Sequence, residues 1–371
     1  MAAGWPYRAP VWLPGGHAQT LCTALWGRSN RIAPLAFERQ RWLAPDGDFI
    51  DADWLECPPG PGVGAATALS PAAGASEHNT AEGMGGGTAL VLFHGLEGSS
   101  RSHYAKTFAA EARRRGWAFV LPHFRGCSGP INLAPRSYHS GDHAEIAWML
   151  RRIREQVGPS CTLYAVGVSL GGNALLRWVQ EAQAAGKVAA PAHVAVSDLP
   201  NVAAVAAISA PLDLTAAGAA IDSGPNRWIY AQMFLRTMKH KARSKGQQFP
   251  GLFDLRRALA ARTLREFDDA FTAPLHGFAG VDDYWKRASA QPSLAAIELP
   301  ALLLNARNDP LVPASSLPGA AEVGPATTLW QPETGGHVGF PGALRWGAAG
   351  AQWDLQTLPT AVCGWLAAQQ G

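Results

Sequence analysis

The sequence predicts an α/β fold with a mostly parallel central sheet, and two observations support this prediction. Continuous apolar runs, typical of parallel strands buried on both faces, occur at residues 88–93, 118–122, 164–168, 202–210 and 301–306. Stretches with the helical spacing of apolar residues lie between these runs, at residues 103–115, 142–157 and 174–180. Strands that alternate with helices in this way form a parallel sheet covered by helices on both faces.

The composition favours one large globular unit. The chain has 371 residues, of which 47% are hydrophobic and 16% are charged. It can therefore bury a substantial core, and disorder is not expected. A single α/β domain with an inserted block fits this length. The formal net charge of +3 is too small to indicate a nucleic acid or a membrane surface as partner.

The cysteines and the N-terminal residues bear on the cellular compartment in which the protein is expected. The five cysteines are scattered and form no C-x-x-C pair, so neither a disulfide framework nor a zinc site is predicted. The first residues lack the basic and apolar segments of a signal peptide. Because no apolar run approaches the ~20 residues of a membrane-spanning helix, we expect a cytoplasmic protein without a transmembrane segment.

A hairpin and two irregular insertions are predicted in the first half of the chain. Residues 37–44 and 49–55 are strand-like and flank an Asp-Gly turn, so we place them as a hairpin at the antiparallel edge of the sheet. Residues 58–88 are of low complexity and cannot bury enough apolar surface to offset their ordering entropy, which predicts a flexible surface loop. Residues 187–200 are interpreted as another inserted loop.

The alternation stops after the sixth predicted strand. Helical patterns at 226–243, 252–267 and 281–290, without an obvious strand, predict a helical lid over residues 214–292 at the carboxyl edge of the sheet. The core would then consist of residues 1–213 and 293–371. Basic residues cluster between 236 and 245 and could meet anionic head groups, but a solvated helix face is the more common cause of such a run.

The most informative motif is Gly167-Val168-Ser169-Leu170-Gly171, because a strand-like run precedes it and a helix-like stretch follows. In this context the pattern predicts a nucleophile elbow, in which the serine sits on a tight, strained turn and exposes its hydroxyl. The Leu170 N–H would lie at a helix N-terminus and could bind an oxyanion. A Gly-rich turn without chemistry is the alternative interpretation.

A second loop of interest is His94-Gly95-Leu96, which follows the strand at 88–93. Enzymes with a nucleophile elbow take their second oxyanion donor from this position. We expect the Leu96 backbone N–H to be that donor, and an ordinary strand–helix loop is the alternative.

A serine hydroxyl is a poor nucleophile at neutral pH and needs a base, which a carboxylate in turn orients. Asp309 follows the predicted strand at 301–306, and His337 follows a short predicted strand at 328–330. With Ser169 they stand in the order serine, acid, histidine. We therefore predict that these three residues form a catalytic triad. Asp213 is a rival for the acid, and Glu333 is a weaker one.

The other histidines are less suited to the role of base. His94, His123 and His139 stand at the wrong positions along the chain, and His17 is interpreted as structural. A metal site at His139, Asp142 and His143 would need a further ligand, so a helix N-cap at Ser140 or Asp142 explains these residues better.

Six motifs give the chain a family resemblance; they lie at residues 13–20, 94–99, 124–129, 167–173, 265–270 and 335–340. On these motifs it resembles the YheT-like α/β-hydrolases, related to the mammalian α/β-hydrolase-domain proteins one and three. The resemblance implies the α/β-hydrolase fold and a Ser169–Asp309–His337 charge relay. It also implies an esterase or lipase that acts on short-chain esters or acylglycerols. The expected mechanism requires no metal or organic cofactor.

The expected function is therefore hydrolysis of a small-molecule acyl ester at Ser169. Two alternatives stay open. One is hydrolysis of amide or peptide bonds by the same triad, and the other is a non-catalytic ligand-binding protein on the same fold.

Overall fold

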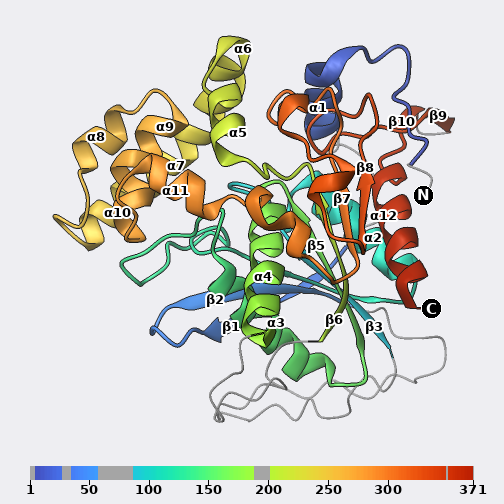
Figure 1. The fold of residues 1–371 in the computed structure, drawn as a ribbon, viewed down its shortest axis with the longest axis horizontal. Coiled ribbons are helices and arrows are strands. Elements are labelled where there is room, and N and C mark those ends of the chain that lie inside the picture. Colours follow the sequence, from blue (N-terminus) through green and yellow to red (C-terminus); the bar gives the residue numbers. More distant parts are fainter. Residues whose placement is uncertain (1–4, 27–34, 57–86, 188–200, 348–349, 371) are drawn as a thin grey trace.

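The computed structural model describes residues 5–26, 35–56, 87–187, 201–347 and 350–370. Its central element is an eight-stranded sheet with the strand order β1-β2-β4-β3-β5-β6-β7-β8 (Figure 1). The six strands β3 to β8 pair in parallel, whereas β1 and β2 join the β4 edge as antiparallel strands. The predicted α/β fold with a mostly parallel sheet is confirmed.

The elements of this core have the following bounds. The sheet contains β1 (Phe37–Leu43), β2 (Phe49–Leu55), β3 (Thr88–Phe93), β4 (Ala118–Pro122), β5 (Thr162–Val168), β6 (Val202–Ile208), β7 (Ala301–Leu304) and β8 (Thr327–Trp330). A separate ribbon consists of β9 (Leu344–Gly347) and β10 (Gly350–Trp353). The longer helices are α1 (Gly15–Trp26), α2 (His103–Arg114), α3 (His143–Val157), α4 (Leu170–Lys187) and α12 (Thr357–Ala367).

Helices cover both faces of the sheet, as Figure 1 shows. Successive side chains of a strand point to opposite faces, so Val91 and Phe93 of β3 belong to one core cluster and Leu90 and Leu92 to the other. The first cluster includes residues of α3 and α4, and the second includes residues of α2 and α12. Burial on both faces explains why the central strands are continuously apolar.

The predicted hairpin at the sheet edge is formed by β1 and β2. Just before β2, the buried Asp48 carboxylate accepts hydrogen bonds from Arg125 (2.7 Å) and Asn132 (2.7 Å). Burial alone would raise the pKa of Asp48, but hydrogen bonds from Asn132 and from backbone N–H groups hold it at about 2. Arg125 also contacts Glu145 of α3 (2.6 Å) and so ties the hairpin to the helix layer.

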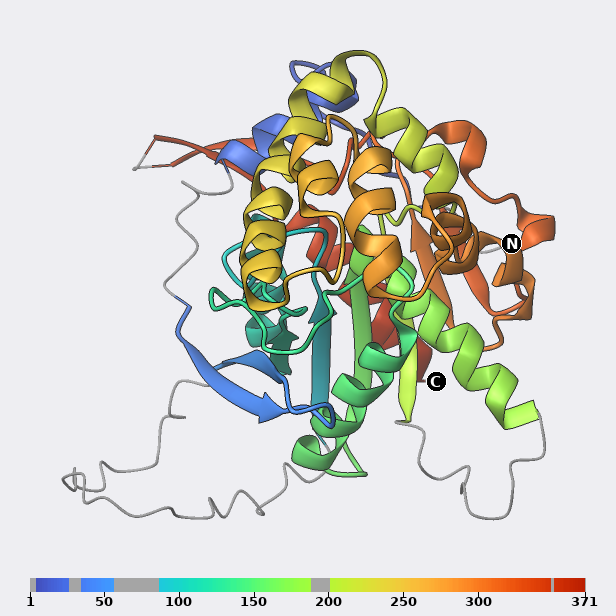
Figure 2. The same ribbon diagram turned by 90° about the vertical axis from the view of Figure 1, so that its left-hand side faces the viewer.

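Residues 214–292, called the helical block below, form helices beside the carboxyl end of the parallel strands (Figure 2). The block has hydrophobic clusters of its own, which include Leu235, Phe267 and Phe271 in one case and Leu214 and Trp285 in another. Its elements are α5 (Leu214–Ile221), α6 (Gly224–Asn226), η2 (Arg227–Ala231), α7 (Gln232–Gln248), α8 (Leu255–Ala260), α9 (Leu264–Phe267), η3 (Asp268–Thr272), α10 (Ala273–Leu275) and α11 (Val281–Ala288).

The prediction of one helix over residues 252–267 is wrong, since two separate helices, α8 and α9, occupy this stretch. The Thr263 side chain caps α9 by accepting from the Glu266 N–H (3.1 Å). The Asp222 carboxylate accepts from the N–H groups of Leu264 (2.7 Å) and Arg265 (2.9 Å). These bonds satisfy the first N–H groups of a new helix, so the chain restarts there instead of continuing α8.

The sequence analysis did not predict α1 or the ribbon of β9 and β10. The predicted loops at 58–88 and 187–200 lie almost wholly outside the described residues. Among the helices that the structure describes, none combines the length and the apolar character needed to cross a membrane.

Candidate active site

Ser169 lies on the turn between β5 and α4. Its φ angle is +52°, a left-handed conformation that residues with a side chain rarely adopt. Its N–H donates to the Ile208 carbonyl (2.8 Å), and its own carbonyl accepts from the Gly172 N–H (2.9 Å). Bonds on both sides of the residue therefore hold the strained backbone in place.

Gly167 and Gly171 make this turn possible. A Cβ atom on Gly167 would lie 2.4 Å from the Gly171 carbonyl oxygen. A Cβ atom on Gly171 would lie 2.5 Å from the carbonyl oxygens of Phe93 and His94. Because these neighbours are backbone atoms of α4, of β3 and of the residue that follows β3, a side chain at either position would push α4 away from β3 and β5.

His337 contacts Ser169 and Asp309 at once. Its Nε2 lies 3.0 Å from the Ser169 Oγ, and its Nδ1 lies 2.8 Å from the Asp309 Oδ2. The His337 side chain is 12% exposed and that of Asp309 is fully buried. With the carboxylate accepting from Nδ1–H, Nε2 is left as the acceptor for the serine hydroxyl.

Asp309 makes further bonds that its rivals lack. Its second oxygen accepts from the N–H groups of Leu311 (2.8 Å) and Val312 (3.2 Å). Asp213 instead caps α5 by accepting from the backbone of residues 215 and 216. Glu333 is 85% exposed and faces Arg307. Of the three carboxylates, the structure brings only Asp309 to His337.

The hydrogen bonds of the His94 ring are structural. Its Nδ1–H donates to the Gly95 carbonyl (2.7 Å), and its Nε2 accepts from the Phe124 N–H (3.1 Å). Complete burial lowers the pKa of His94 to about 3, so the ring stays neutral. It thereby joins the loop after β3 to the loop after β4.

The other three histidines considered in the sequence analysis bond or pack with other partners. His123 bonds to Asp53 (2.8 Å), and the His17 Nδ1 lies 3.2 Å from the Tyr230 hydroxyl, with the two rings stacked. His139 packs on other aromatic rings, and burial lowers its pKa to about 3.

The helix α3 begins with Asp142 at its N-cap position, as one interpretation of the sequence had it. The Asp142 side chain makes no capping bond, however, and pairs with Arg136 (2.5 Å). In the part of the chain that the structure describes, no three His, Cys, Asp or Glu side chains are grouped as metal ligands would be.

The N-terminal helix α1 binds both loops that carry the acid and the histidine, which the sequence analysis missed. The buried Gln19 Oε1 accepts from Asn308 Nδ2 (2.9 Å) and from the Gly335 N–H (2.8 Å). Thr20 Oγ1 accepts from the His337 N–H (2.8 Å). These bonds fix the backbone beside the acid and the histidine. The signal was the motif at residues 13–20, which had no assigned role.

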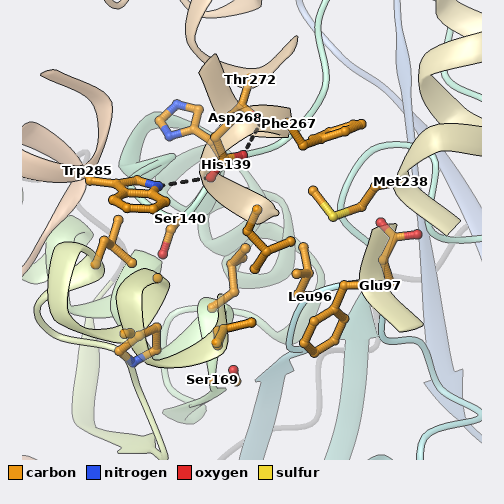
Figure 3. Close-up of a pocket in the computed structure, with 18 of the residues that line it drawn as sticks. Leu96, Glu97, His139, Ser140, Ser169, Met238, Phe267, Asp268, Thr272 and Trp285 are labelled. Carbon is orange, nitrogen blue, oxygen red and sulfur yellow. Dashed lines mark hydrogen bonds between the residues drawn. The ribbon is translucent and has the colours of Figure 1, made fainter. Parts of the chain in front are cut away.

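The candidate oxyanion donors Leu96 and Leu170 line the same pocket as Ser169 and His337. The pocket lies between the sheet edge and the helical block, and its empty space of about 960 Å³ is partly open to solvent. Its wall is mainly apolar, and Figure 3 shows Leu96, Met238 and Phe267 around it.

Carboxylate side chains lie at two places in this mainly apolar wall. At one end, the Asp268 carboxylate accepts from Trp285 Nε1 (2.9 Å) and from the Thr272 hydroxyl (2.6 Å), as Figure 3 shows. Burial raises the pKa of Asp268 to about 6, although both hydrogen bonds act to lower it. Elsewhere the wall contains the ion pair of Glu97 and Lys241 (2.7 Å).

A parallel sheet with a serine on its strand–helix turn, and an acid and a histidine on later loops, is the arrangement of the α/β hydrolases. Residues 88–343 match the family model described as the alpha/beta hydrolase fold. The chain is 35% identical over 328 residues to "Putative esterase YheT" of Escherichia coli (strain K12), covering 88% of this chain and 84% of that protein. It therefore belongs to the α/β-hydrolase family, in the YheT-like group.

More distant relatives carry the names of lipid hydrolases. Human phospholipase ABHD3 is 26% identical over 338 residues, which cover 90% of this chain and 73% of that protein. The monoacylglycerol lipase of Saccharomyces cerevisiae is 26% identical over 259 residues, which cover 68% of this chain and 54% of that protein.

Proposed function

We propose that this chain is a serine hydrolase that cleaves carboxylic esters through an acyl-enzyme on Ser169. The observation that carries the proposal is the hydrogen-bond chain from Ser169 Oγ through His337 to Asp309 at the wall of an apolar pocket. Relatives named as an esterase, a phospholipase and a monoacylglycerol lipase support the choice of ester bonds.

The first half of the reaction forms the acyl-enzyme. Ser169 Oγ attacks the acyl carbon while His337 Nε2 takes the hydroxyl proton. Asp309 keeps the proton on Nδ1 and stabilises the imidazolium. The backbone N–H groups of Leu96 and Leu170 bind the oxyanion of the tetrahedral intermediate. When this intermediate collapses, His337 gives its proton to the leaving alcohol.

The second half releases the acid. His337 takes a proton from a water molecule, and the resulting nucleophile attacks the acyl carbon on Ser169. The second intermediate uses the same oxyanion donors, and its collapse returns the proton to the Ser169 Oγ.

The pocket supports an apolar acyl group as the part of the substrate that it holds. Phe234, Met238 and Phe267 of the helical block contribute to its wall. In this proposal, residues 214–292 act as the lid of the site, and residues 1–213 and 293–371 are the two parts of the core. Short-chain esters and acylglycerol-type lipids are the substrate classes that fit.

The test is labelling with a fluorophosphonate probe, followed by assays on p-nitrophenyl esters and aminoacyl anilides. We expect one label at Ser169, hydrolysis of the esters, and loss of both in Ser169→Ala. Preference for the anilides would replace the esterase by an amidase. Failure of the probe to label a folded protein would indicate a non-catalytic ligand-binding protein.

A further inference from the structure

The outer face of the helical block exposes apolar side chains close together. Trp228 is 74% exposed, Ile229 is 40% exposed and Met233 is 54% exposed. Nine large hydrophobic side chains are exposed in the described part of the chain, and three of them lie between residues 228 and 233. An exposed tryptophan beside two other apolar side chains is typical of a surface that binds a partner.

The Lys and Arg side chains of the same segment have no acidic counterpart within it. Between residues 223 and 253 the chain contains six Lys and Arg residues and no Asp or Glu. Two of the six turn inward, because Lys241 pairs with Glu97 and Lys245 donates to the carbonyls of residues 132 and 134. The others, Arg236 and Arg243 among them, lie on a segment that has no acidic residue of its own.

The apolar and the basic residues share one side of the helix. Ile229, Met233, Arg236, His240 and Arg243 follow one another at spacings of three and four residues, and all are exposed. This side is apolar at its start, in η2 and the first turn of α7, and basic further along. A helix of this kind lies in the plane of an anionic bilayer, with its apolar side chains between the head groups.

The opposite side of the same helix faces the pocket. Phe234, Met238 and Lys241 of α7 line the cavity that contains Ser169. At the other end, Tyr230 of η2 stacks on His17 of α1, which holds the segment against the core. A surface that bound the outer side of α7 would therefore lie one helix diameter from the pocket.

We propose that η2 and α7 dock on an anionic phospholipid bilayer. Trp228, Ile229 and Met233 enter the head-group region, and Arg236 and Arg243 face the lipid phosphates. Because this segment has basic but no acidic residues, we expect its partner to be negatively charged. A second copy of this chain would present the same basic segment and so is not a complementary partner. This inference deepens the proposed function, because it names a lipid surface as the source of the substrate.

The experiment measures binding apart from catalysis. The full chain carrying Ser169→Ala is sedimented with vesicles of phosphatidylcholine and phosphatidylglycerol, and with vesicles of phosphatidylcholine alone. We expect binding to the anionic vesicles only, with an affinity that falls as salt is added. Arg236→Glu with Arg243→Glu should lower the affinity tenfold or more, at ~1 kcal/mol per basic residue. Trp228→Ser with Met233→Ser should lower it by a similar factor.

Matched controls lie elsewhere on the surface. Leu43→Ser removes an exposed leucine at the end of β1, and Arg151→Glu reverses an exposed charge on α3. Both should bind vesicles as the parent does, and thermal unfolding verifies that every variant is folded. Equal binding by parent and docking variants, or no binding to anionic vesicles, would overturn the inference.

Two further outcomes are distinguishable. A parent that dimerises in solution, while Trp228→Ser is monomeric, would assign the face to a second copy and also overturn the inference. Failure of the proposed function would instead appear in the unmutated chain, as absence of probe labelling at Ser169, and would leave the vesicle result unaffected.

Discussion

The ammonium group of Lys241 in α7 lies 2.7 Å from the carboxylate of Glu97, in the loop that follows β3. Glu97 directly follows Leu96 and has a φ angle of +57°. Its N–H donates to the Tyr138 hydroxyl (3.0 Å), and that hydroxyl donates to its carboxylate (2.7 Å). The helical block therefore holds, through one ion pair, the backbone that bears a proposed oxyanion donor.

The first prediction follows from this ion pair. Lys241→Met leaves the carboxylate of Glu97, whose side chain is 12% exposed, without its cation and loosens the loop, so the Leu96 N–H should be less well aligned with the oxyanion. Loss of an oxyanion donor costs about 10²–10³ in kcat, and for a displaced one we expect about tenfold. Steady-state kinetics on a soluble p-nitrophenyl ester provide the measurement.

The separate changes in kcat and KM distinguish a misaligned Leu96 N–H from damage to the pocket. We expect kcat to fall with little change in KM, and Lys241→Arg to recover part of the loss because it restores the charge. Lys239→Met, a neighbouring substitution on the same helix, is the control. A Lys241→Met enzyme with unchanged kcat would show that the ion pair does not position the loop.

The second prediction separates the two candidate acids. Asp309→Asn should lower kcat by about 10⁴. The N–H groups of Leu311 and Val312 would hold the amide oxygen, so the amide NH₂ would donate to Nδ1 of His337 and impose the wrong tautomer on the ring. Asp213→Asn should keep nearly full kcat and lose at most ~1 kcal/mol of stability, since Asp213 only caps α5. Kinetics and urea unfolding of both variants are compared. A large loss of kcat in Asp213→Asn alone would reverse the assignment.

The three triad candidates could be predicted because the chemistry of a serine nucleophile restricts both the residue types and their order along the chain. A strand followed by Gly-x-Ser-x-Gly left few choices for the serine, and Asp309 and His337 followed from their places after later strands. The structure brings the three side chains within hydrogen-bond distance of one another. Their catalytic roles remain predictions.

The residues around the site were not predictable in the same way. Gln19 binds Asn308 and Gly335, which lie about 300 residues further along the chain. A contact of this kind depends on which loops meet in space, and no periodicity or local propensity records it. For the same reason the helix over 252–267 was predicted as continuous, although Asp222 starts a new helix at residue 264.

The third prediction concerns Gln19. Gln19→Leu keeps the size of the side chain but leaves the N–H of Gly335 and the amide of Asn308 without their acceptor in a buried place. Each unsatisfied group costs about 1–3 kcal/mol, so urea unfolding should show a loss of about that size or larger. Because the loop that carries His337 begins at Gly335, kcat should fall as well.

A conservative variant tests the cause. Gln19→Glu retains an acceptor for both groups and should recover part of kcat at neutral pH. If Gln19→Leu loses stability while its kcat per folded molecule is unchanged, the glutamine stabilises the fold without positioning the histidine.

The fourth prediction is a pH dependence of stability that arises from Asp268. Burial raises its pKa to about 6 in the folded protein, from 3.8 as the ordinary value. A raised pKa means that the folded state favours the protonated carboxyl group. The corresponding stability is fully present below pH ~4 and is lost as the pH rises through the folded pKa. A shift of about two pH units corresponds to about 3 kcal/mol.

Asp268→Asn should remove this dependence, because the amide does not ionise. The free energy of unfolding of the parent, relative to the variant, should fall by about 2–3 kcal/mol between pH 4 and pH 7. Only this change with pH is diagnostic, since Asn also alters the bonds to Thr272 and Trp285 at every pH. Asp282→Asn, at a side chain that is 77% exposed in the same block, is the matched control and should follow the parent. A constant difference between the parent and Asp268→Asn across this range would show that the carboxyl group does not change its ionisation there. The end of the pocket formed by Asp268 would then have the same charge throughout.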